Sequence, residues 1–559
     1  MNVAELIADT IVALGVRHVF GVGGANIEDV FSAVQRRQPR TRVVLNKHEH
    51  AAGTAADAYA RLTGGVGVVL VTSGGGAMNL VHALAEAYAS RVPLLAVVGE
   101  PPTELQGAGA FQDTSGKGGS VDAATVFRGV TTFCARVEQA EDAPRLLATA
   151  LDAATELAGP AVLLIAKDRQ RAEVPSGAMT ALERTKPRSP DVDPELSRRA
   201  ADLLRVGPTV VFAGSEVSRS GARHELVRLA ERLDARVCTT PDARDAFPND
   251  SARFLGVCGA MGTPGVASAV AAARTCLLAG TRLPLLARQG LEPLLTEKRL
   301  VSIGREAPFV MPERTFHVAG GVAAGLRALN AELGAAQVVE PPILPPASAV
   351  EADGPLSVRV ALAALERGLP HDGVVLVDAG NTGAAAAHQL RLPSKARWLL
   401  AMGMAGMGYS FGAAVGAALA TGKRCTVLAG DGAFFMNGLD VHTAVEHGLP
   451  ITYVVFDNRA HGMCLVRERL LLHENAGYNT FGSSHLGAGL GAMFPRLLAF
   501  DCRTAAELDA ALERARGVPG PAFVSVELDE VEIPPFAALQ AANTDGALSV
   551  PRGASHASD

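Results

Sequence analysis

The sequence predicts an α/β protein built from three doubly wound parallel-sheet domains. Short runs rich in Val, Ile and Leu alternate along the chain with Ala- and Leu-rich helical stretches, a rhythm typical of parallel sheets covered by helices. The chain of 559 residues is too long for one hydrophobic core and suits about three domains. Two proline-containing stretches, at 171–192 and 336–356, divide it into segments of ordinary domain size.

Composition limits the functional classes. Hydrophobic residues make up 48% and charged residues 19%, which suits a large, well-buried enzyme. The formal charge of −6 gives no reason to expect nucleic acid as a partner. The seven cysteines are scattered singly, without a CxxC pair, which indicates reduced thiols and a cytoplasmic location.

Two segments bear on membrane targeting. The N-terminal "MNVAELIADTIVALGV" carries Glu5 and Asp9 inside its apolar pattern, so it predicts an amphipathic helix rather than a signal peptide. From Trp398 to Gly422 there is no charged residue, and this length would span a bilayer. Glycines interrupt the segment throughout, so we expect a loop leading into a buried, closely packed helix, and no membrane partner.

The first and third segments share one plan. "GVVLVTSGGGAMNLVHALAEAYASRVPLLAVVGE" and "RCTVLAGDGAFFMNGLDVHTAVEHGLPITYVVFDN" each read as a strand, a turn of small residues, Met-Asn, a helix, a proline-containing turn and a second strand. The central segment, with its apolar run "PTVVFAGS", lacks this plan. We therefore expect two related domains on either side of an unlike one.

The stretch "VLAGDGAFFMNG" places Asp431 at a strand-to-helix turn, with the helical pattern starting at Ala433. The N–H groups of such a turn bind phosphate, which a carboxylate would repel unless a cation lay between them. The next strand, "ITYVVF", ends at Asp457-Asn458 and returns to the same sheet edge. Asp431, Asn458, a nearby carbonyl and phosphate oxygens would complete an octahedral set for Mg²⁺. The alternative is local hydrogen bonding by a turn Asp and a strand-end Asn.

This pattern resembles the thiamine-diphosphate-dependent enzymes of the acetohydroxyacid (acetolactate) synthase and pyruvate decarboxylase group. Their signature is GDG followed by a pair of asparagines, the first of which is Asp457 here. The resemblance covers almost the whole chain and implies that thiamine diphosphate binds through Mg²⁺ held by Asp431, Asn458 and the Ala460 carbonyl. It also implies the domain order pyrimidine-binding, central and diphosphate-binding. We place these domains at 1–170, 190–335 and 357–540, and we expect a flexible tail at 541–559.

The stretch "LNKHEHAAGTAADAYARLTG" places Glu49 at the entrance of an Ala-rich helix. An apolar setting disfavours an ionised carboxylate and allows it to share a proton. The resemblance implies that Glu49 bonds N1′ of the aminopyrimidine and promotes the imino tautomer, which deprotonates C2 of the thiazolium to give the ylid. The alternative is a helix-start charge stabilised by the helix dipole.

Other matches nominate residues around the cofactor. "LLAMGMAGMGYSFG" resembles the segment that bends the cofactor, with Met407 under the bend and the Ala405 carbonyl near the 4′-amino group. "DAGNTG" resembles a diphosphate loop, and "FGVGGAN" and "TSGGGAMN" resemble glycine loops beside the thiazolium. The alternatives are core packing for Met407 and a simple turn for "DAGNTG". The resemblance implies these further cofactor-binding residues: Ala379, Gly380, Asn381, Thr382, Gly430, Gly432, Ala433 and Met463.

Substrate contacts are implied by "GAFQDT" and "IAKDRQ", which resemble acetohydroxyacid synthase segments and nominate Phe111, Gln112 and Lys167. The alternative for Lys167 is a solvated surface charge. In "HGMCLVRERL", Arg467 replaces the tryptophan that selects the acceptor in the synthases. His461, just beyond the metal loop, is the histidine best placed for proton transfer, and the adjacent histidine pair of pyruvate decarboxylases is not seen.

The resemblance implies decarboxylation of a 2-oxo acid, with pyruvate expected, and acyl transfer to a second carbonyl compound. Alternatives are a simple 2-oxo acid decarboxylase, a 2-hydroxyacyl-CoA lyase and a catalytically silent cofactor-binding paralogue. A homodimer or homotetramer is implied, because the family's cofactor spans the first and third domains of different subunits. "AGTRLPLLARQG" and "VSIGREAP" stand where FAD-binding relatives carry other motifs, so we do not expect bound FAD.

Overall fold

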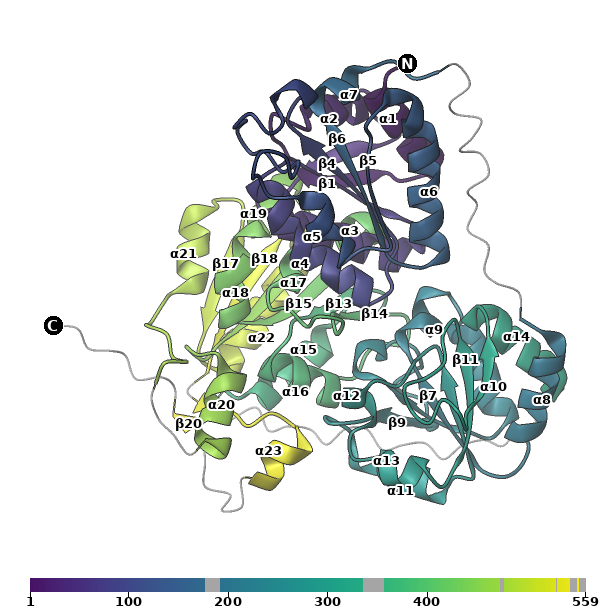
Figure 1. Ribbon diagram of the computed structural model, residues 1–559. Coiled ribbons are helices and arrows are strands. Elements are labelled where there is room, and N and C mark those ends of the chain that lie inside the picture. Colours follow the sequence, from purple (N-terminus) through teal and green to yellow (C-terminus); the bar gives the residue numbers. More distant parts are fainter. Residues whose placement is uncertain (176–191, 335–355, 473–476, 529, 543–549, 552–559) are drawn as a thin grey trace. The chain divides into compact units, whose positions relative to one another are not determined.

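The computed structural model describes residues 1–175, 192–334, 356–472, 477–528, 530–542 and 550–551. They contain three six-stranded parallel sheets, as the predicted fold class requires (Figure 1). The expected linkers and the expected tail at 541–559 lie mostly outside the described residues. The chain divides into two compact units: Met1–Arg188, Ala401–Gly422 and Ala433–Ile451 form the first, and Ser189–Leu400, Lys423–Gly432 and Thr452–Asp559 form the second.

The first unit holds a sheet of order β2-β1-β3-β4-β6-β5. The predicted amphipathic helix at the N-terminus is present as α1, which buries its apolar face. The strands are β1 (His18–Val22), β2 (Arg42–Leu45), β3 (Gly67–Val71), β4 (Leu94–Glu100), β5 (Phe133–Arg136) and β6 (Pro160–Ala166). The helices are α1 (Val3–Ala13), α2 (Glu28–Gln35), α3 (Glu49–Thr63), α4 (Gly75–Ala89), α5 (Ala123–Arg128), α6 (Ala143–Glu156) and α7 (Lys167–Arg171).

The uncharged segment begins in strand β14 (Arg397–Leu400) and continues as a loop and then as α17 (Tyr409–Thr421), which packs on α3 in the first unit. Cβ atoms added at Gly412 and Gly416 would lie 2.4 Å and 1.9 Å from backbone oxygens of α3. Only glycine permits this close approach, so the predicted loop and buried helix are confirmed. Within the described ranges, no helix is long and apolar enough to cross a membrane.

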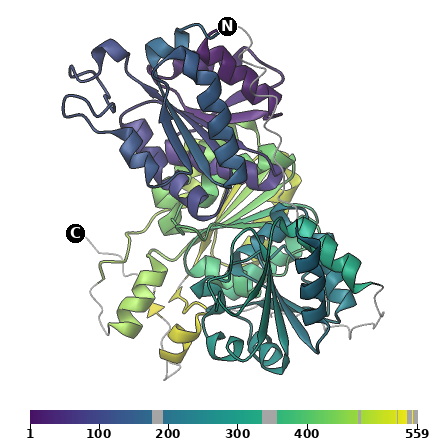
Figure 2. The same ribbon diagram turned by 45° about the vertical axis from the view of Figure 1, so that its right-hand side comes forward.

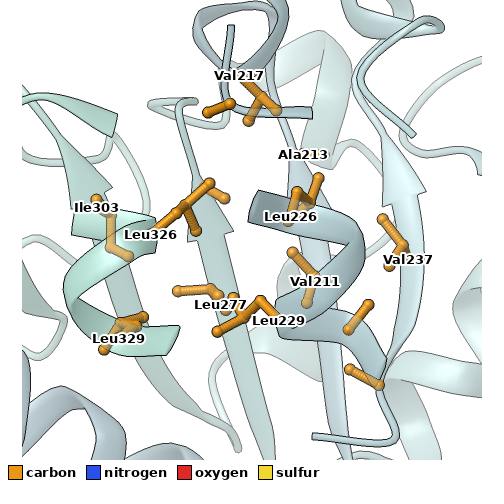
Figure 3. Packing of buried hydrophobic residues seen from close by; sticks show 14 of the residues in the cluster. Val211, Ala213, Val217, Leu226, Leu229, Val237, Leu277, Ile303, Leu326 and Leu329 are labelled. Carbon is orange, nitrogen blue, oxygen red and sulfur yellow. The ribbon is translucent and has the colours of Figure 1, made fainter. Parts of the chain in front are cut away.

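The second sheet, in the second unit, has the order β12-β11-β10-β7-β8-β9. Alternate residues of β7 point to opposite faces: Val211 and Ala213 join the apolar cluster with α8, α10 and α14 (Figure 3), while Val210 and Phe212 join the one with α11. Helices therefore cover both faces. The strands are β7 (Thr209–Ala213), β8 (Arg236–Thr239), β9 (Phe254–Val257), β10 (Thr275–Ala279), β11 (Arg299–Gly304) and β12 (Phe316–Ala319). The helices are α8 (Pro194–Leu204), α9 (Ser215–Arg219), α10 (Arg223–Arg232), α11 (Pro264–Ala272), α12 (Leu285–Arg288), α13 (Glu292–Leu295) and α14 (Val322–Leu333).

The third sheet has the order β14-β13-β15-β16-β18-β17. Its strands are coloured green to yellow in Figure 2. Counted from the first strand of each domain, this is the order of the first sheet, whereas the second sheet differs. The expected pair of related domains around an unlike one is therefore confirmed. The strands are β13 (Val374–Val377), β14 (Arg397–Leu400), β15 (Cys425–Gly430), β16 (Ile451–Asp457), β17 (Leu498–Cys502) and β18 (Ala522–Glu527). The remaining elements are α15 (Val358–Gly368), α16 (Asn381–Gln389), α18 (Asp431–Asn437), α19 (Val441–His447), α20 (Gly462–Leu471), α21 (Leu486–Met493), α22 (Ala505–Gly517), α23 (Ala537–Ala542) and the paired β19 (Glu530–Val531) and β20 (Val550–Pro551).

One predicted boundary is wrong: α18 begins at Asp431, two residues before Ala433. The Asp431 carboxylate accepts the N–H of Gly432 at 2.9 Å, which satisfies an amide that has no partner inside the first turn of a helix. In both related sheets the chain reverses its winding direction beside the first strand, between β1 and β3 and between β13 and β15. Loops after such strands form the crevice where α/β proteins bind ligands.

Candidate active site

Glu49 is the first residue of α3 and is 8% exposed. The side chain of His48 caps the helix by accepting the N–H of His50 at 3.1 Å. The Asn79 amide, on α4, donates to Glu49 Oε2 at 3.0 Å, and a Cβ atom added at Gly76 would lie 3.0 Å from Glu49 Oε1. The carboxylate is therefore oriented by the glycine-rich start of α4, as expected for a group that exchanges a proton at one position.

The two glycine loops singled out in the sequence lie side by side at the carboxyl edge of the first sheet. Asn26, after β1, donates to Ser73 Oγ, after β3, at 2.8 Å, and both residues are buried. A Cβ atom added at Gly24 would lie 2.6 Å from Cβ of Thr72. The two loops thus form one surface that includes the residues next to Glu49.

Two of the three substrate residues nominated from the sequence reach this surface. A Cβ atom added at Gly74 would lie 2.8 Å from Cβ of Gln112, whose backbone has a positive φ of 58°. Lys167 donates through Nζ to the carbonyl oxygen of Ala25 and pairs with Glu28. Phe111, in contrast, is 85% exposed. The structure therefore brings Gln112 and Lys167, but not the Phe111 ring, against the glycine loops.

His50 and His82 stack with ring centroids 4.6 Å apart in the first unit. Burial, and then the neighbouring His82 and His48, lowers the pKa of His50 to about 3. The His50 ring is consequently neutral near pH 7 and can serve as a hydrogen-bonding group but not as a cation.

The segment expected to bend the cofactor also lies in the first unit. Ala405 has φ 53°, a left-handed conformation that is uncommon for a residue other than glycine, and Met407 is half-buried. Gly408 has φ 86°, and a Cβ atom there would lie 2.4 Å from the side-chain nitrogen of Asn437. The backbone of this loop therefore has a defined conformation with close contacts to its neighbours.

The turn after β13 lies in the second unit. Asp378 is buried and accepts the N–H of Ala379 at 3.0 Å, and Gly380 takes φ 122°, which favours glycine. Asn381, the first residue of α16, donates to the carbonyl oxygen of Glu532 at 3.1 Å, while its buried Oδ1 has no hydrogen-bond partner among the described residues. A buried acceptor without a donor is a place where a ligand or water would be stabilised.

The predicted metal ligands are brought together at the carboxyl edge of the third sheet. The N–H of Ala460 donates both to Asp431 Oδ2, at 3.2 Å, and to Asn458 Oδ1, at 3.1 Å. Burial, and then the adjacent Asp457 carboxylate, raises the pKa of Asp431. A bound cation would favour the ionised form of Asp431, so these residues fit a divalent ion. The described residues contain no cluster of three or more His, Cys, Asp or Glu side chains suited to a metal, and the expected set needs only one such side chain.

The three residues nominated after the metal loop, His461, Met463 and Arg467, lie in different surroundings. His461 packs against the GDG turn, because a Cβ atom added at Gly432 would lie 2.6 Å from its Nδ1, and its ring contacts Phe481 edge-on at 4.7 Å. Met463 and Arg467 lie one turn apart on α20, Met463 half-buried and Arg467 exposed. His461 is thus in contact with the GDG turn of the expected metal site.

A cavity of about 350 Å³ opens in the second unit beside the turn after β13. Asn381, Thr382 and Asn458 line it together with Gly259 and residues between 528 and 540. Its volume lies within the range of small-molecule sites, and two of the expected diphosphate residues share it with one expected metal ligand.

Two contacts to the candidate site residues were missed from sequence. Asn79 orients Glu49, and Asn437 contacts Gly408 and hydrogen-bonds to His50. Both asparagines belong to the Met-Asn pair repeated in the first and third segments. That repetition was the available signal, since a polar residue recurring at one position of two related domains is a candidate for a shared role.

Comparison with protein families gives three matches in chain order. The model described as "Thiamine pyrophosphate enzyme, N-terminal TPP binding domain" matches residues 1–118. The central-domain model of the same family matches residues 198–329, and its C-terminal TPP binding domain matches residues 378–526. Together the three models span most of the chain, and each contains one of the three sheets or the greater part of it.

Two individual relatives and one solved structure each share less than 30% sequence identity with this chain. The probable acetolactate synthase large subunit of Methanocaldococcus jannaschii is 27% identical, over 96% of this chain and 93% of that protein. The sulfoacetaldehyde acetyltransferase of Castellaniella defragrans is 28% identical, over 83% and 82%. Among solved structures, the thiamine diphosphate-dependent 4-hydroxybenzoylformate decarboxylase of Rhodococcus jostii RHA1 has a TM-score of 0.82 and 23% identity, over 94% of this chain and 99% of that one. The last comparison shows a shared fold.

Proposed function

The chain belongs to the thiamine pyrophosphate enzyme family, and from this premise we propose that it decarboxylates a 2-oxo acid and transfers the acyl group to a second carbonyl compound. Pyruvate is the proposed donor. The observation that carries the proposal is the position of Glu49 and Gln112 against one loop, near Gly76 and Gly74 respectively. An acid–base carboxylate and a side chain that ends in a hydrogen-bonding amide, both beside the glycine-rich start of α4, suit a pocket that orients an acceptor as well as a donor.

Each residue then has a definite task. Thiamine diphosphate, when bound, supplies the nucleophilic carbon that adds to the carbonyl group and takes up the electrons released with CO₂. Asp431, Asn458 and the Ala460 carbonyl would hold the Mg²⁺ that binds its diphosphate. Glu49, oriented by Asn79, exchanges a proton with the aminopyrimidine.

The substrate side is formed by the glycine loops. Gln112 offers an amide donor and an acceptor to the acceptor substrate. Lys167 orients the loop through the Ala25 carbonyl, since its ammonium group is already paired with Glu28. The exposed Arg467 could recognise an acceptor carboxylate through a bidentate contact.

Product analysis tests the reaction. With Mg²⁺, thiamine diphosphate and pyruvate, we expect a carbon–carbon-bonded product whose yield rises when a second 2-oxo acid or an aldehyde is added. Acetaldehyde as the only product with every acceptor would establish the decarboxylase alternative instead. Cleavage of a 2-hydroxyacyl-CoA, assayed in parallel, would establish the lyase.

Gln112→Leu is expected to lower the ratio of ligated product to aldehyde by about tenfold, because one hydrogen bond to a charged or polarised substrate group is lost. Gln106→Leu is the matched control, since Gln106 lies in the same loop and its side chain hydrogen-bonds to Pro101 and Lys117. Equal ratios of ligated product to aldehyde in the two variants would show that Gln112 does not bind the acceptor.

We also propose that the enzyme is at least a homodimer. Phe435, Met436 and Leu439, in and after α18, are 52%, 51% and 57% exposed, and they flank Asn437, which contacts the 403–408 loop. Apolar side chains gathered and exposed to this extent mark a contact surface. A partner subunit bound there would cover the 403–408 loop, which is expected to contact the cofactor.

Met436→Glu is expected to shift the protein toward monomer and to abolish activity, because a buried unpaired charge would oppose association. Sedimentation velocity at assay concentration measures the shift. Leu157→Glu is the control, because Leu157 is 57% exposed elsewhere in the same unit. A wild-type monomer with full activity would contradict the dimer.

A further inference from the structure

Glu86, in the last turn of α4, is buried and has its carboxylate against the backbone of another segment of the first unit. Oε1 accepts the N–H of Gly403 at 3.1 Å, and Oε2 accepts the N–H groups of Met404 at 2.6 Å and Ala405 at 3.3 Å. Three donors converging on one side chain require a group that only accepts hydrogen bonds, and an ionised carboxylate is that group.

The loop that Glu86 holds has a constrained shape. Ala405 is left-handed, a conformation that is strained for residues other than glycine and persists only where neighbouring contacts enforce it. Cβ atoms added at Gly403 and Gly406 would lie 2.8 Å from Ser90 Oγ and 2.0 Å from His82 Nε2. His82 and Glu86 are one turn apart on α4, with Ser90 one turn further on, so a single helix face shapes the loop.

The charges around Glu86 explain why the loop amides matter. Arg61 donates to Asp57 at 2.6 Å and reaches Glu86 only at 3.4 Å, and Asp57 also accepts the Tyr409 hydroxyl. Two buried carboxylates therefore share one buried guanidinium group. Beyond this weak contact with Arg61, the negative charge of Glu86 is stabilised by the Ser90 hydroxyl, at 2.6 Å, and by the three loop N–H groups.

We propose that Glu86 is a positioning residue for the cofactor: it holds the backbone of residues 403–405 so that the Ala405 carbonyl can receive the aminopyrimidine. This assignment of Ala405 rests on the proposed function. Glu86 does not touch the cofactor in this role, and it acts by stabilising the left-handed turn before the cofactor arrives. A preformed loop strengthens binding because less conformational entropy is lost on association.

Amide hydrogen exchange of the cofactor-free protein tests the contact itself. Glu86→Gln places an NH₂ group among three N–H donors, so we expect exchange of a peptide covering 401–408 to rise at least about tenfold, while peptides of the sheet are unchanged. Glu86→Asp keeps the negative charge near Arg61, but its shorter side chain no longer reaches the loop N–H groups. We therefore expect the same rise in exchange at 401–408. Glu100→Gln is the control, because Glu100 is equally buried and paired with Arg136. Unchanged exchange at 401–408 in both Glu86 variants would overturn the proposal.

Calorimetric titration with thiamine diphosphate at saturating Mg²⁺ tests the consequence. We expect Kd to rise about tenfold or more in both Glu86 variants and to stay within about twofold of wild type in Glu100→Gln. Wild-type affinity in the Glu86 variants would overturn the positioning role. A wild-type protein that binds no thiamine diphosphate would contradict the proposed function, while amide exchange would still decide whether Glu86 holds the loop.

Discussion

Asp431→Asn is expected to weaken Mg²⁺-dependent binding of thiamine diphosphate at least about 100-fold. The amide keeps the size of the side chain but removes the one carboxylate of the expected ligand set, and loss of even an outer partner of a metal ligand costs 10- to 100-fold in affinity. Calorimetric titration of the cofactor at saturating Mg²⁺ measures the effect. Unchanged affinity would show that Asp431 is not a metal ligand.

Asp457→Asn is the matched control, because Asp457 is an equally buried carboxylate beside Asp431. We expect it to retain cofactor binding, since the resemblance places no metal ligand there. If Asp457→Asn lost cofactor binding and Asp431→Asn kept it, Asp457 and not Asp431 would be the metal ligand.

The Asp431→Asn variant should fold. A carboxyl group whose pKa is higher in the folded than in the unfolded protein binds protons more readily when folded, so the stability it contributes is lost as pH rises above the unfolded value. The pKa of Asp431 is raised in this way, by burial first. At neutral pH the cofactor-free Asp431→Asn protein is therefore expected to keep or exceed the wild-type Tm.

Glu49→Gln is expected to slow exchange of the C2 proton of bound thiamine diphosphate by about 10²-fold or more, while the cofactor still binds. The amide preserves the size of the side chain and an acceptor for Asn79, but it removes the acid–base function, whose usual contribution is of this size. Exchange in ²H₂O followed by acid quench and NMR measures the rate. Wild-type exchange in the variant would leave Glu49 with only a helix-start role.

A second control tests the alternative that Glu49 only stabilises the start of α3. Glu195 lies in the first turn of α8 and is exposed, so Glu195→Gln removes a charge from a helix start far along the chain. We expect a loss of at most about 1 kcal/mol in stability and no change in C2 exchange. A catalytic effect confined to Glu49→Gln separates proton exchange from helix stabilisation.

Much of the geometry of the candidate site could be predicted because the nominated residues stand at the ends of regular elements. Asp431 and Asn458 follow neighbouring parallel strands, so the sheet itself brings them to one edge. Glu49 begins an Ala-rich helix, and the order of elements that repeats in the first and third domains was readable from the strand and turn patterns. The start of α18 was misplaced because a side chain, Asp431, and not the apolar periodicity, determined where the helix begins.

The sequence by itself thus determined the fold class, the three domains, the family and the residues that follow sheet strands, since these depend on local periodicity and on short motifs. Only the tertiary structure decided which partners act on them: Asn79 on Glu49, Lys167 on the Ala25 carbonyl, and Glu86 on the loop at Gly403–Ala405. Each of these contacts joins residues from 30 to more than 300 positions apart. Hydrogen bonds of this kind are set by packing of whole elements against one another, and no local pattern in a single sequence encodes their partners.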